Sequence, residues 1–156
     1  MEATPNTLLE NTLDKFWETV PPAWRAIRAQ IRACAEQHEL TVEQFHILRH
    51  VNKGMQSISE IAAERRISRP AVSQAVDGLE NKGLLTRTTN PGDRRYTDLE
   101  LTAEGRLLLN AIFEQTRAWM RVRLERLPAS ELEQLAAGFE ILGRTFAESA
   151  SPPGGA

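Results

Sequence analysis

Five residues near the middle of the chain have the chemistry and the spacing to read DNA. They form the start and the outward face of one predicted helix: Ser68, Arg69, Pro70, Ser73 and Gln74. A glutamine can pair with adenine at two points, an arginine can pair with guanine, and a serine can bond to a base or a phosphate. The set therefore predicts a helix whose first turns reach base edges in the major groove.

Two short helices joined by a tight turn would hold this surface. The first begins with the capping box Ser57-Ile58-Ser59-Glu60 and is predicted to run through Arg66. We count Ser57 among the candidate DNA-binding residues. Ser68 is a good cap for the second helix, and Gly83 can end it. Four apolar residues of the second helix share the face opposite the reading surface and should be buried: Val72, Ala75, Val76 and Leu79.

A basic β-hairpin is predicted directly after these helices. Residues 84–89 favour a strand, Asn90-Pro91-Gly92-Asp93 is a strong turn signal, and residues 96–101 alternate between polar and apolar types. Three candidate DNA-binding residues would lie at the hairpin tip and one on its first strand: Asp93, Arg94, Arg95 and Arg87. An arginine on an extended hairpin can enter the minor groove, where the potential is most negative. The whole pattern predicts a winged helix-turn-helix.

The charge distribution agrees with one basic surface on an acidic protein. The 156 residues carry 19 basic and 21 acidic side chains, a net charge of −2. Between Arg65 and Arg95, however, seven basic side chains stand against three acidic ones. One surface can then face phosphates while the flanks stay acidic. The single cysteine excludes an intrachain disulfide, and no apolar run approaches the roughly 18–20 residues of a membrane helix, so we expect a cytoplasmic protein without membrane contact.

Helical segments with apolar stripes flank the predicted winged region. Capping boxes that begin at Thr41 and Ser130 predict two further helix starts, and Pro21-Pro22 should break or kink the first helix. The stripes in residues 8–35 and 107–146 carry more apolar surface than one thin domain could cover, which indicates an interface. A two-fold dimer would also place two reading helices about 34–36 Å apart, in successive major grooves.

The predicted fold is therefore mainly α-helical with a small β-hairpin wing, a winged helix-turn-helix joined to a helical dimerisation region. We expect N-terminal dimerisation helices in residues 1–37 and a DNA-binding domain in residues 38–102. Dimerisation helices follow in residues 103–149. The last residues, 150–156, are rich in proline and glycine and should form a disordered tail.

Residues 40–105 resemble the MarR family of bacterial transcriptional regulators. The resemblance rests on a set of short matches: Leu40-Thr41, Phe45, Leu48, Ser59-Glu60-Ile61-Ala62, Pro70-Ala71-Val72-Ser73, Val76-Asp77-Gly78-Leu79-Glu80, Lys82-Gly83-Leu84, Arg87, Asp93-Arg94-Arg95 and Leu101-Thr102 with Gly105. Each match is weak alone, but together they are specific. The resemblance implies a homodimer that binds a palindromic operator in double-stranded DNA, usually as a repressor that a small ligand releases.

The resemblance also implies roles for the hairpin residues. Asp93 would orient an arginine, and either Arg94 or Arg95 would enter the minor groove. Arg87 matches a strand position that would support the wing or touch a phosphate. A dimeric interaction module that has lost DNA binding is an alternative, although the intact Arg94, Arg95 and Gln74 argue against it.

An effector site is predicted by analogy with the family, in the crevice between dimer helices and winged domain. Five aromatic or basic residues could form a pocket for an aromatic acid or a phenol: Trp17, Trp24, Arg25, Arg28 and His46. The competing interpretation is that the tryptophans belong to the core and that the arginines form a solvated face.

Other chemistry has weaker support in the sequence. Cys34 could sense peroxide, which needs an accessible thiolate, but a cysteine on an apolar helix stripe is usually an inert core residue. Glu43, His46 and His50 share one helix, yet no fourth ligand is evident, so we expect no metal and no cofactor. No phosphate-binding loop or convincing nucleophile and base is present, and we therefore expect that the protein is not an enzyme.

Overall fold

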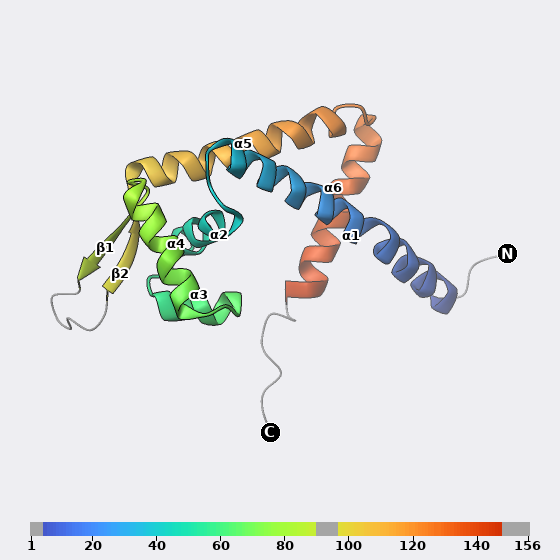
Figure 1. Ribbon diagram of the computed structural model, residues 1–156. Coiled ribbons are helices and arrows are strands. Elements are labelled where there is room, and N and C mark those ends of the chain that lie inside the picture. The colour runs from blue at the N-terminus through green and yellow to red at the C-terminus, as the bar shows by residue number, and fades with distance from the viewer. Residues whose placement is uncertain (1–4, 90–96, 148–156) are drawn as a thin grey trace, which may run out of the picture. The chain divides into compact units, whose positions relative to one another are not determined.

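The computed structural model describes residues 5–89 and 97–147, which form six helices and one antiparallel hairpin (Figure 1). The elements in chain order are α1 (Pro5–Gln37), α2 (Val42–Asn52), α3 (Ile58–Arg65), α4 (Arg69–Asn81), β1 (Leu85–Thr89), β2 (Thr97–Leu101), α5 (Ala103–Leu124) and α6 (Ala129–Ala147). This is the predicted mainly helical fold with a two-stranded sheet. The helix-turn-helix consists of α3 and α4, and the hairpin follows directly.

The chain divides into two compact units that meet between Thr116 and Arg117. The first unit contains one hydrophobic core, to which α2, α3, α4 and the hairpin all contribute. Both flanking helices also enter this core, through Cys34 near the end of α1 and through Leu109 and Ile112 in the first half of α5. The winged region therefore buries its apolar surface with help from helices on both sides of it.

Local signals in the sequence correctly predicted three of the four helix starts that they addressed. Thr41 and Gln44 form a reciprocal capping box on α2, Ser57 and Glu60 form another on α3, and Ser68 caps α4. The predicted box at Ser130 is wrong. α6 begins at Ala129, so Ser130 lies inside the helix and does not cap it. The backbone N–H groups of Glu131 and Leu132 donate to the carbonyl of Pro128.

Of the expected break or kink at Pro21-Pro22, the break is wrong, because α1 is one continuous helix of 33 residues. Two prolines remove two backbone donors, which in a helix would bond to the carbonyls of Trp17 and Glu18. Both of these residues are exposed. Water can therefore bond to the freed carbonyls, which lowers the cost of carrying prolines inside the helix.

Gly105 lies where the start of α5 meets the backbone that follows α4. A Cβ atom at this position would come within 2.0 Å of the carbonyl oxygen of Leu84. The hydroxyl of Thr102 links the two backbone segments that meet here, because it donates to Gly83 O at 2.7 Å and accepts from Gly105 N at 3.0 Å. A glycine is therefore required at this contact.

We predict that Gly105→Ala lowers the free energy of unfolding by about 2–3 kcal/mol or more, because the atom in its way is backbone and cannot rotate aside. Urea unfolding followed by circular dichroism measures the change. Glu104→Ala is the matched control, since Glu104 is exposed on the same turn, and it should cost less than about 1 kcal/mol. Equal stability of the two variants would contradict the close approach.

Candidate nucleic-acid interface

Helix α4 is held by one face, and its opposite face is open. Val72, Val76 and Leu79 are fully buried in the core of the first unit. On the other side Gln74 is exposed and Ser73 is half-buried, and Arg69 and Pro70 are exposed in the first turn. The residues predicted to read bases thus lie together on one accessible surface, although their contact with DNA remains a prediction.

The serine caps hold the N-termini of α3 and α4 and leave their hydroxyl protons available. Ser57 Oγ accepts from Glu60 N at 3.1 Å, and Ser68 Oγ accepts from Ala71 N at 3.3 Å. A hydroxyl that accepts in this way can still donate its own proton to a phosphate oxygen. In addition, the guanidinium of Arg69 donates to the hydroxyl of Ser59, which links the start of α4 to α3.

Arg87 connects strand β1 of the wing to helix α4. The guanidinium of Arg87, which lies on β1, forms ion pairs with two carboxylates of α4. One is with Asp77, at 2.7 Å, and the other is with Glu80. Asp77 lies on the open side of α4, where its side chain is 56% exposed. Its negative charge would repel phosphate, and the neighbouring guanidinium offsets it. Of the two roles considered for Arg87, these contacts favour support of the wing.

The two carboxylates that pair with Arg87 were not predicted from the sequence. Their spacing was a usable signal, because residues three apart near the end of a helix share a face. The strand that follows the helix immediately carries the arginine. A helix, a tight turn and a strand in this order bring the strand back beside the end of the helix.

The tip of the wing lies outside the described residues, including the candidates Asp93, Arg94 and Arg95. The stem is described and has a regular antiparallel register, from Leu85 opposite Leu101 to Thr89 opposite Thr97. The two strands are anchored in the core of the first unit, because Leu85, Leu99 and Leu101 are buried there.

A second ion pair joins α2 to α3 beside the half-buried His46 and the buried His50. Arg65 donates from Nε and Nη2 to the two carboxylate oxygens of Glu43, at 3.3 and 3.1 Å. Burial, with the positive charges of Arg65 and Arg49, lowers the pKa of His46 from 6.5 to about 4. Burial and Arg49 also lower the pKa of His50. Both histidines are therefore neutral at pH 7.

Acid should weaken this part of the fold. The unfolded chain protonates His46 near pH 6.5 and the folded chain only near pH 4. Between these values the unfolded state binds the extra proton, so the free energy of unfolding falls as the pH drops through this window. We expect His46 to contribute about 1–2 kcal/mol of this loss, after allowance for its partial exposure.

The measurement is urea unfolding at several values between pH 7 and pH 4, for the wild type and for His46→Gln. The difference between the two proteins isolates His46 from the carboxylates that also titrate near pH 4. If the two stability profiles run parallel, the lowered pKa of His46 is wrong.

The five effector candidates lie on α1 and α2 and differ in their exposure. Trp17 and Trp24 lie on α1 and are 70% and 52% exposed, whereas His46 on α2 is half-buried. Arg25 and Arg28 are exposed on α1. The tryptophans are thus not core residues of the described chain, and the predicted pocket would need a further surface to close it.

The two other candidate chemistries find little support. Cys34 is only 2% exposed, and its Sγ accepts a hydrogen bond from Gln30 Nε2 at 3.3 Å. A thiol packed in a core is not the accessible thiolate that peroxide sensing needs. Within residues 5–89 and 97–147, no three His, Cys, Asp or Glu side chains are placed to hold a metal ion. No helix in the same ranges is long and apolar enough to cross a membrane.

Comparisons with known proteins agree with this architecture. A family model described as "MarR family" matches residues 38–95. The HTH-type transcriptional repressor MdtR of Bacillus subtilis (strain 168) is 32% identical over 114 residues, which are 72% of this chain and 74% of MdtR. The chain belongs to the MarR family. The HTH-type transcriptional regulator MhqR of the same organism is 30% identical over 130 residues, 83% of this chain and 90% of MhqR.

A solved structure extends the comparison to a ligand-bound protein. NadR in complex with 4-hydroxyphenylacetate is similar with a TM-score of 0.57 and 27% identity, over 79% of this chain and 88% of NadR. As a member of the MarR family, this chain is a DNA-binding transcriptional regulator and not an enzyme.

The two roles considered for Arg87 predict different salt dependence. Loss of one phosphate contact reduces the slope of log affinity against log salt by about 1. We expect Arg87→Gln to weaken DNA binding about 3- to 30-fold with an unchanged slope, because the loosened wing would lose its fixed position. Fluorescence anisotropy at several salt concentrations gives both numbers. A slope that flattens by about 1 would instead assign Arg87 to a phosphate.

Proposed function

We propose that this chain is a homodimeric repressor that binds a palindromic operator and is released by a small aromatic acid or phenol. Helix α4 enters the major groove, and an arginine of the wing, Arg94 or Arg95, enters the minor groove. The observation that carries this proposal is the orientation of α4, whose apolar face is buried and whose hydrogen-bonding face is open.

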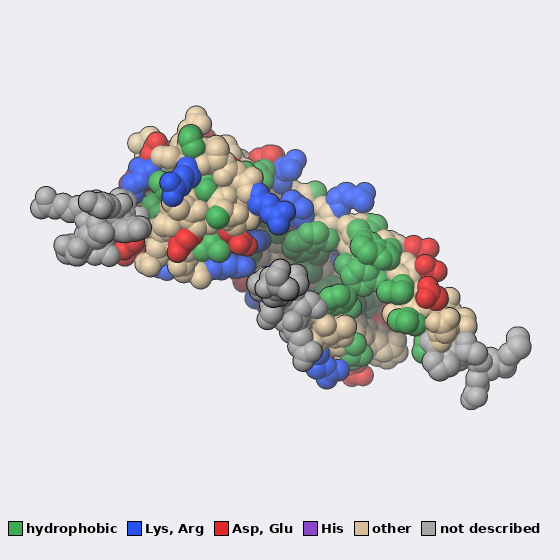
Figure 2. Space-filling view, turned by 90° about the horizontal axis from the view of Figure 1, so that it is seen from below, with side chains coloured by type: hydrophobic (Ala, Val, Ile, Leu, Met, Phe, Trp, Pro, Cys, Tyr) green, Lys and Arg blue, Asp and Glu red, His purple; other side chains and the backbone are tan. Residues whose placement is uncertain are grey.

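The homodimer is supported by apolar side chains that the chain exposes. They lie on α1, on α5 and on α6: Leu8, Leu9, Leu13, Trp17, Val20, Trp24, Leu107, Val122, Leu132, Phe139, Ile141 and Phe146. Figure 2 shows hydrophobic side chains gathered on the surface near the start of α1. None of the described residues of α6 is buried. Apolar surface of this extent marks an interface.

Operator binding is supported by the chemistry of the open face of α4. Gln74 can form two hydrogen bonds to an adenine, and Arg69 can do the same with a guanine. Ser57, Ser68 and Ser73 add hydroxyl donors of the kind that bind phosphates or base edges. A two-fold dimer presents this set twice, which matches a palindrome.

Repression and release by an effector are supported by the relatives. MdtR is named as a transcriptional repressor, and NadR has been solved with 4-hydroxyphenylacetate. In this chain we assign the effector to Trp17, Trp24, Arg25, Arg28 and His46, where arginines can pair with a carboxylate and tryptophans can stack on a ring. A second copy would supply the surface that encloses the exposed tryptophans. The protein would act in the cytoplasm.

The test of the proposed function begins with the operator, which can be selected from a random pool of duplexes. Gln74→Ala should weaken binding to the selected operator by about 1–3 kcal/mol and relax the preference at one base position in each half-site. Binding to unrelated DNA should not change. Lys15→Gln, a change on α1, is the control. If Gln74→Ala kept the full sequence preference, α4 would not be the reading helix.

A further inference from the structure

Arg66 has a left-handed backbone in the turn between α3 and α4 (Figure 1). Its φ and ψ angles are 54° and 43°, a conformation that brings the Cβ atom of an L residue too close to a carbonyl oxygen. Glycine adopts this conformation freely and is the usual residue just after the end of a helix. In the described chain, Glu39 is the other residue besides glycine with a positive φ, of 57°. An arginine at position 66 therefore costs stability that a glycine would not cost.

The contacts of the fold involve only the backbone of Arg66. Its N–H group donates to the carbonyls of Ala62 and Ala63 and so ends α3. A glycine would keep both bonds. The side chain is exposed, and within residues 5–89 and 97–147 its guanidinium has no hydrogen bond or ion pair. The fold alone therefore does not explain why this residue is an arginine.

The other cations near Arg66 are bound to groups of the protein. Their partners are a carboxylate, a hydroxyl, a backbone carbonyl and a pair of carboxylates: Arg65 binds Glu43, Arg69 binds Ser59, Lys82 binds Glu39 O, and Arg87 binds Asp77 and Glu80. Among the described residues from 65 to 89, Arg66 is thus the cation whose charge is available to a partner outside the chain.

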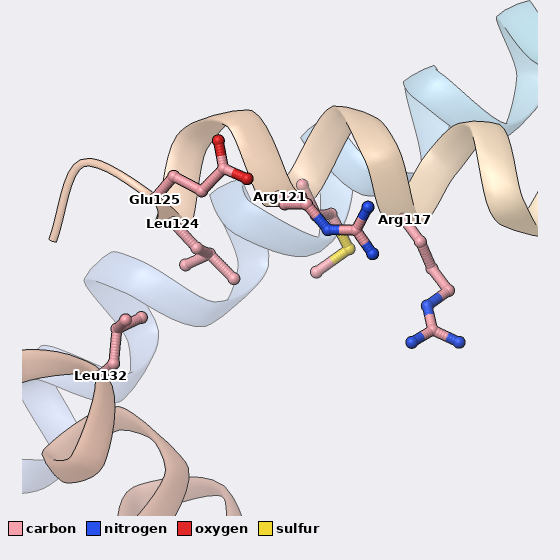
Figure 3. A pocket seen from close by; sticks show the side chains of 6 residues that line it. Arg117, Arg121, Leu124, Glu125 and Leu132 are labelled. Atoms are coloured by element: carbon pink, nitrogen blue, oxygen red, sulfur yellow. The ribbon is translucent and has the colours of Figure 1, made fainter. Parts of the chain in front are cut away.

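Exposed arginines elsewhere in the chain lie on regular helices. Arg117 and Arg121, for example, extend from α5 beside a pocket (Figure 3). Arginine is a favourable residue inside a helix, so exposure there indicates no function. At Arg66 the unfavourable backbone is an additional observation, because strain of this kind persists at sites where a function requires the residue.

We propose that Arg66 is a further DNA-binding residue, whose guanidinium binds a phosphate of the operator backbone beside the start of α4. Three peptide steps, at most about 11 Å, separate its Cα atom from that of Arg69, the first residue of α4. The major groove is about 12 Å wide, so a helix that lies in it has a phosphate backbone on either side. A guanidinium can donate two hydrogen bonds to one phosphate. This inference rests on the proposed role of α4 and adds a contact that positions the helix without reading sequence.

Arg66→Gly tests the proposal, because the stability of the fold and its affinity for DNA should change in opposite directions. The melting temperature, followed by circular dichroism, should stay equal or rise by up to about 4 °C, since glycine relieves the backbone. Affinity for the selected operator and for unrelated DNA should both fall about 5- to 30-fold. The slope of log affinity against log salt, measured by fluorescence anisotropy, should flatten by about 1 for each bound chain.

Two further substitutions separate the charge of Arg66 from the flexibility of its turn. Arg66→Asn removes the charge but keeps a side chain that tolerates the left-handed conformation, so it should weaken DNA binding as Arg66→Gly does. Arg66→Lys keeps the charge on the same backbone. It should bind DNA within about fivefold of the wild type and with the same slope, because the slope counts neutralised phosphates.

Two controls match the changes in backbone and in charge. Glu39→Gly relieves the other left-handed residue without removing a cation, and Lys15→Gln removes a cation from an exposed position on α1. Both should leave the affinity for DNA and its salt slope unchanged. If Lys15→Gln flattened the slope as much as Arg66→Gly, the effect would be one of total charge and the phosphate contact would be wrong.

The remaining outcomes are distinct. A lower melting temperature for Arg66→Gly would assign the arginine to the fold, and weaker binding with an unchanged slope would assign the loss to a loosened turn. Either result would overturn the proposal. If Arg66→Gly keeps full affinity while Gln74→Ala still relaxes the base preference, the phosphate contact is wrong and the proposed function stands. A wild type that selects no operator would instead overturn the proposed function.

Discussion

The burial of one face of α4 is the constraint on which the rest of this protein depends. Val72, Val76 and Leu79 have no exposed surface, and their burial decides which side of the helix is left open. Removing a buried aliphatic side chain of this kind costs several kcal/mol in general, a large part of the stability of a small domain. The exposed face of α4 is therefore fixed by residues that lie in the core.

The core that holds α4 is built from more than the helix-turn-helix and the hairpin. Leu40 and Phe45 come from the start of α2 and the turn before it, and Cys34, Leu109 and Ile112 come from the flanking helices. Phe45 also packs edge-on against Phe113 of α5, with ring centroids 6.0 Å apart. The close approach at Gly105 lets α5 start directly beneath the wing. The short helices and the hairpin bury enough apolar surface for a stable core only because the long helices α1 and α5 pack against them.

Features that depend on neighbouring residues along the chain were predicted correctly from the sequence. Features that depend on contacts with distant residues or with water were not. The caps at Thr41, Ser57 and Ser68 and the alternation through Leu99 and Leu101 are local patterns, and they led to correct elements. Pro21-Pro22 misled because a proline's cost depends on whether the freed carbonyls meet water. The pairing of Arg87 with Asp77 and Glu80 depends on how a strand returns to a helix, and the Glu43–Arg65 pair spans 22 residues.

Control of DNA binding by an effector requires that the helices outside the winged region share its packing. A ligand shifts an equilibrium only by its difference in affinity for two states, so its site must change when α4 moves. α1 meets this requirement, because the helix that exposes Trp17 and Trp24 continues without interruption to Cys34 and Ala35 in the core. The two prolines do not divide this helix into independent parts. A tilt of α1 would therefore repack the core that it shares with α4.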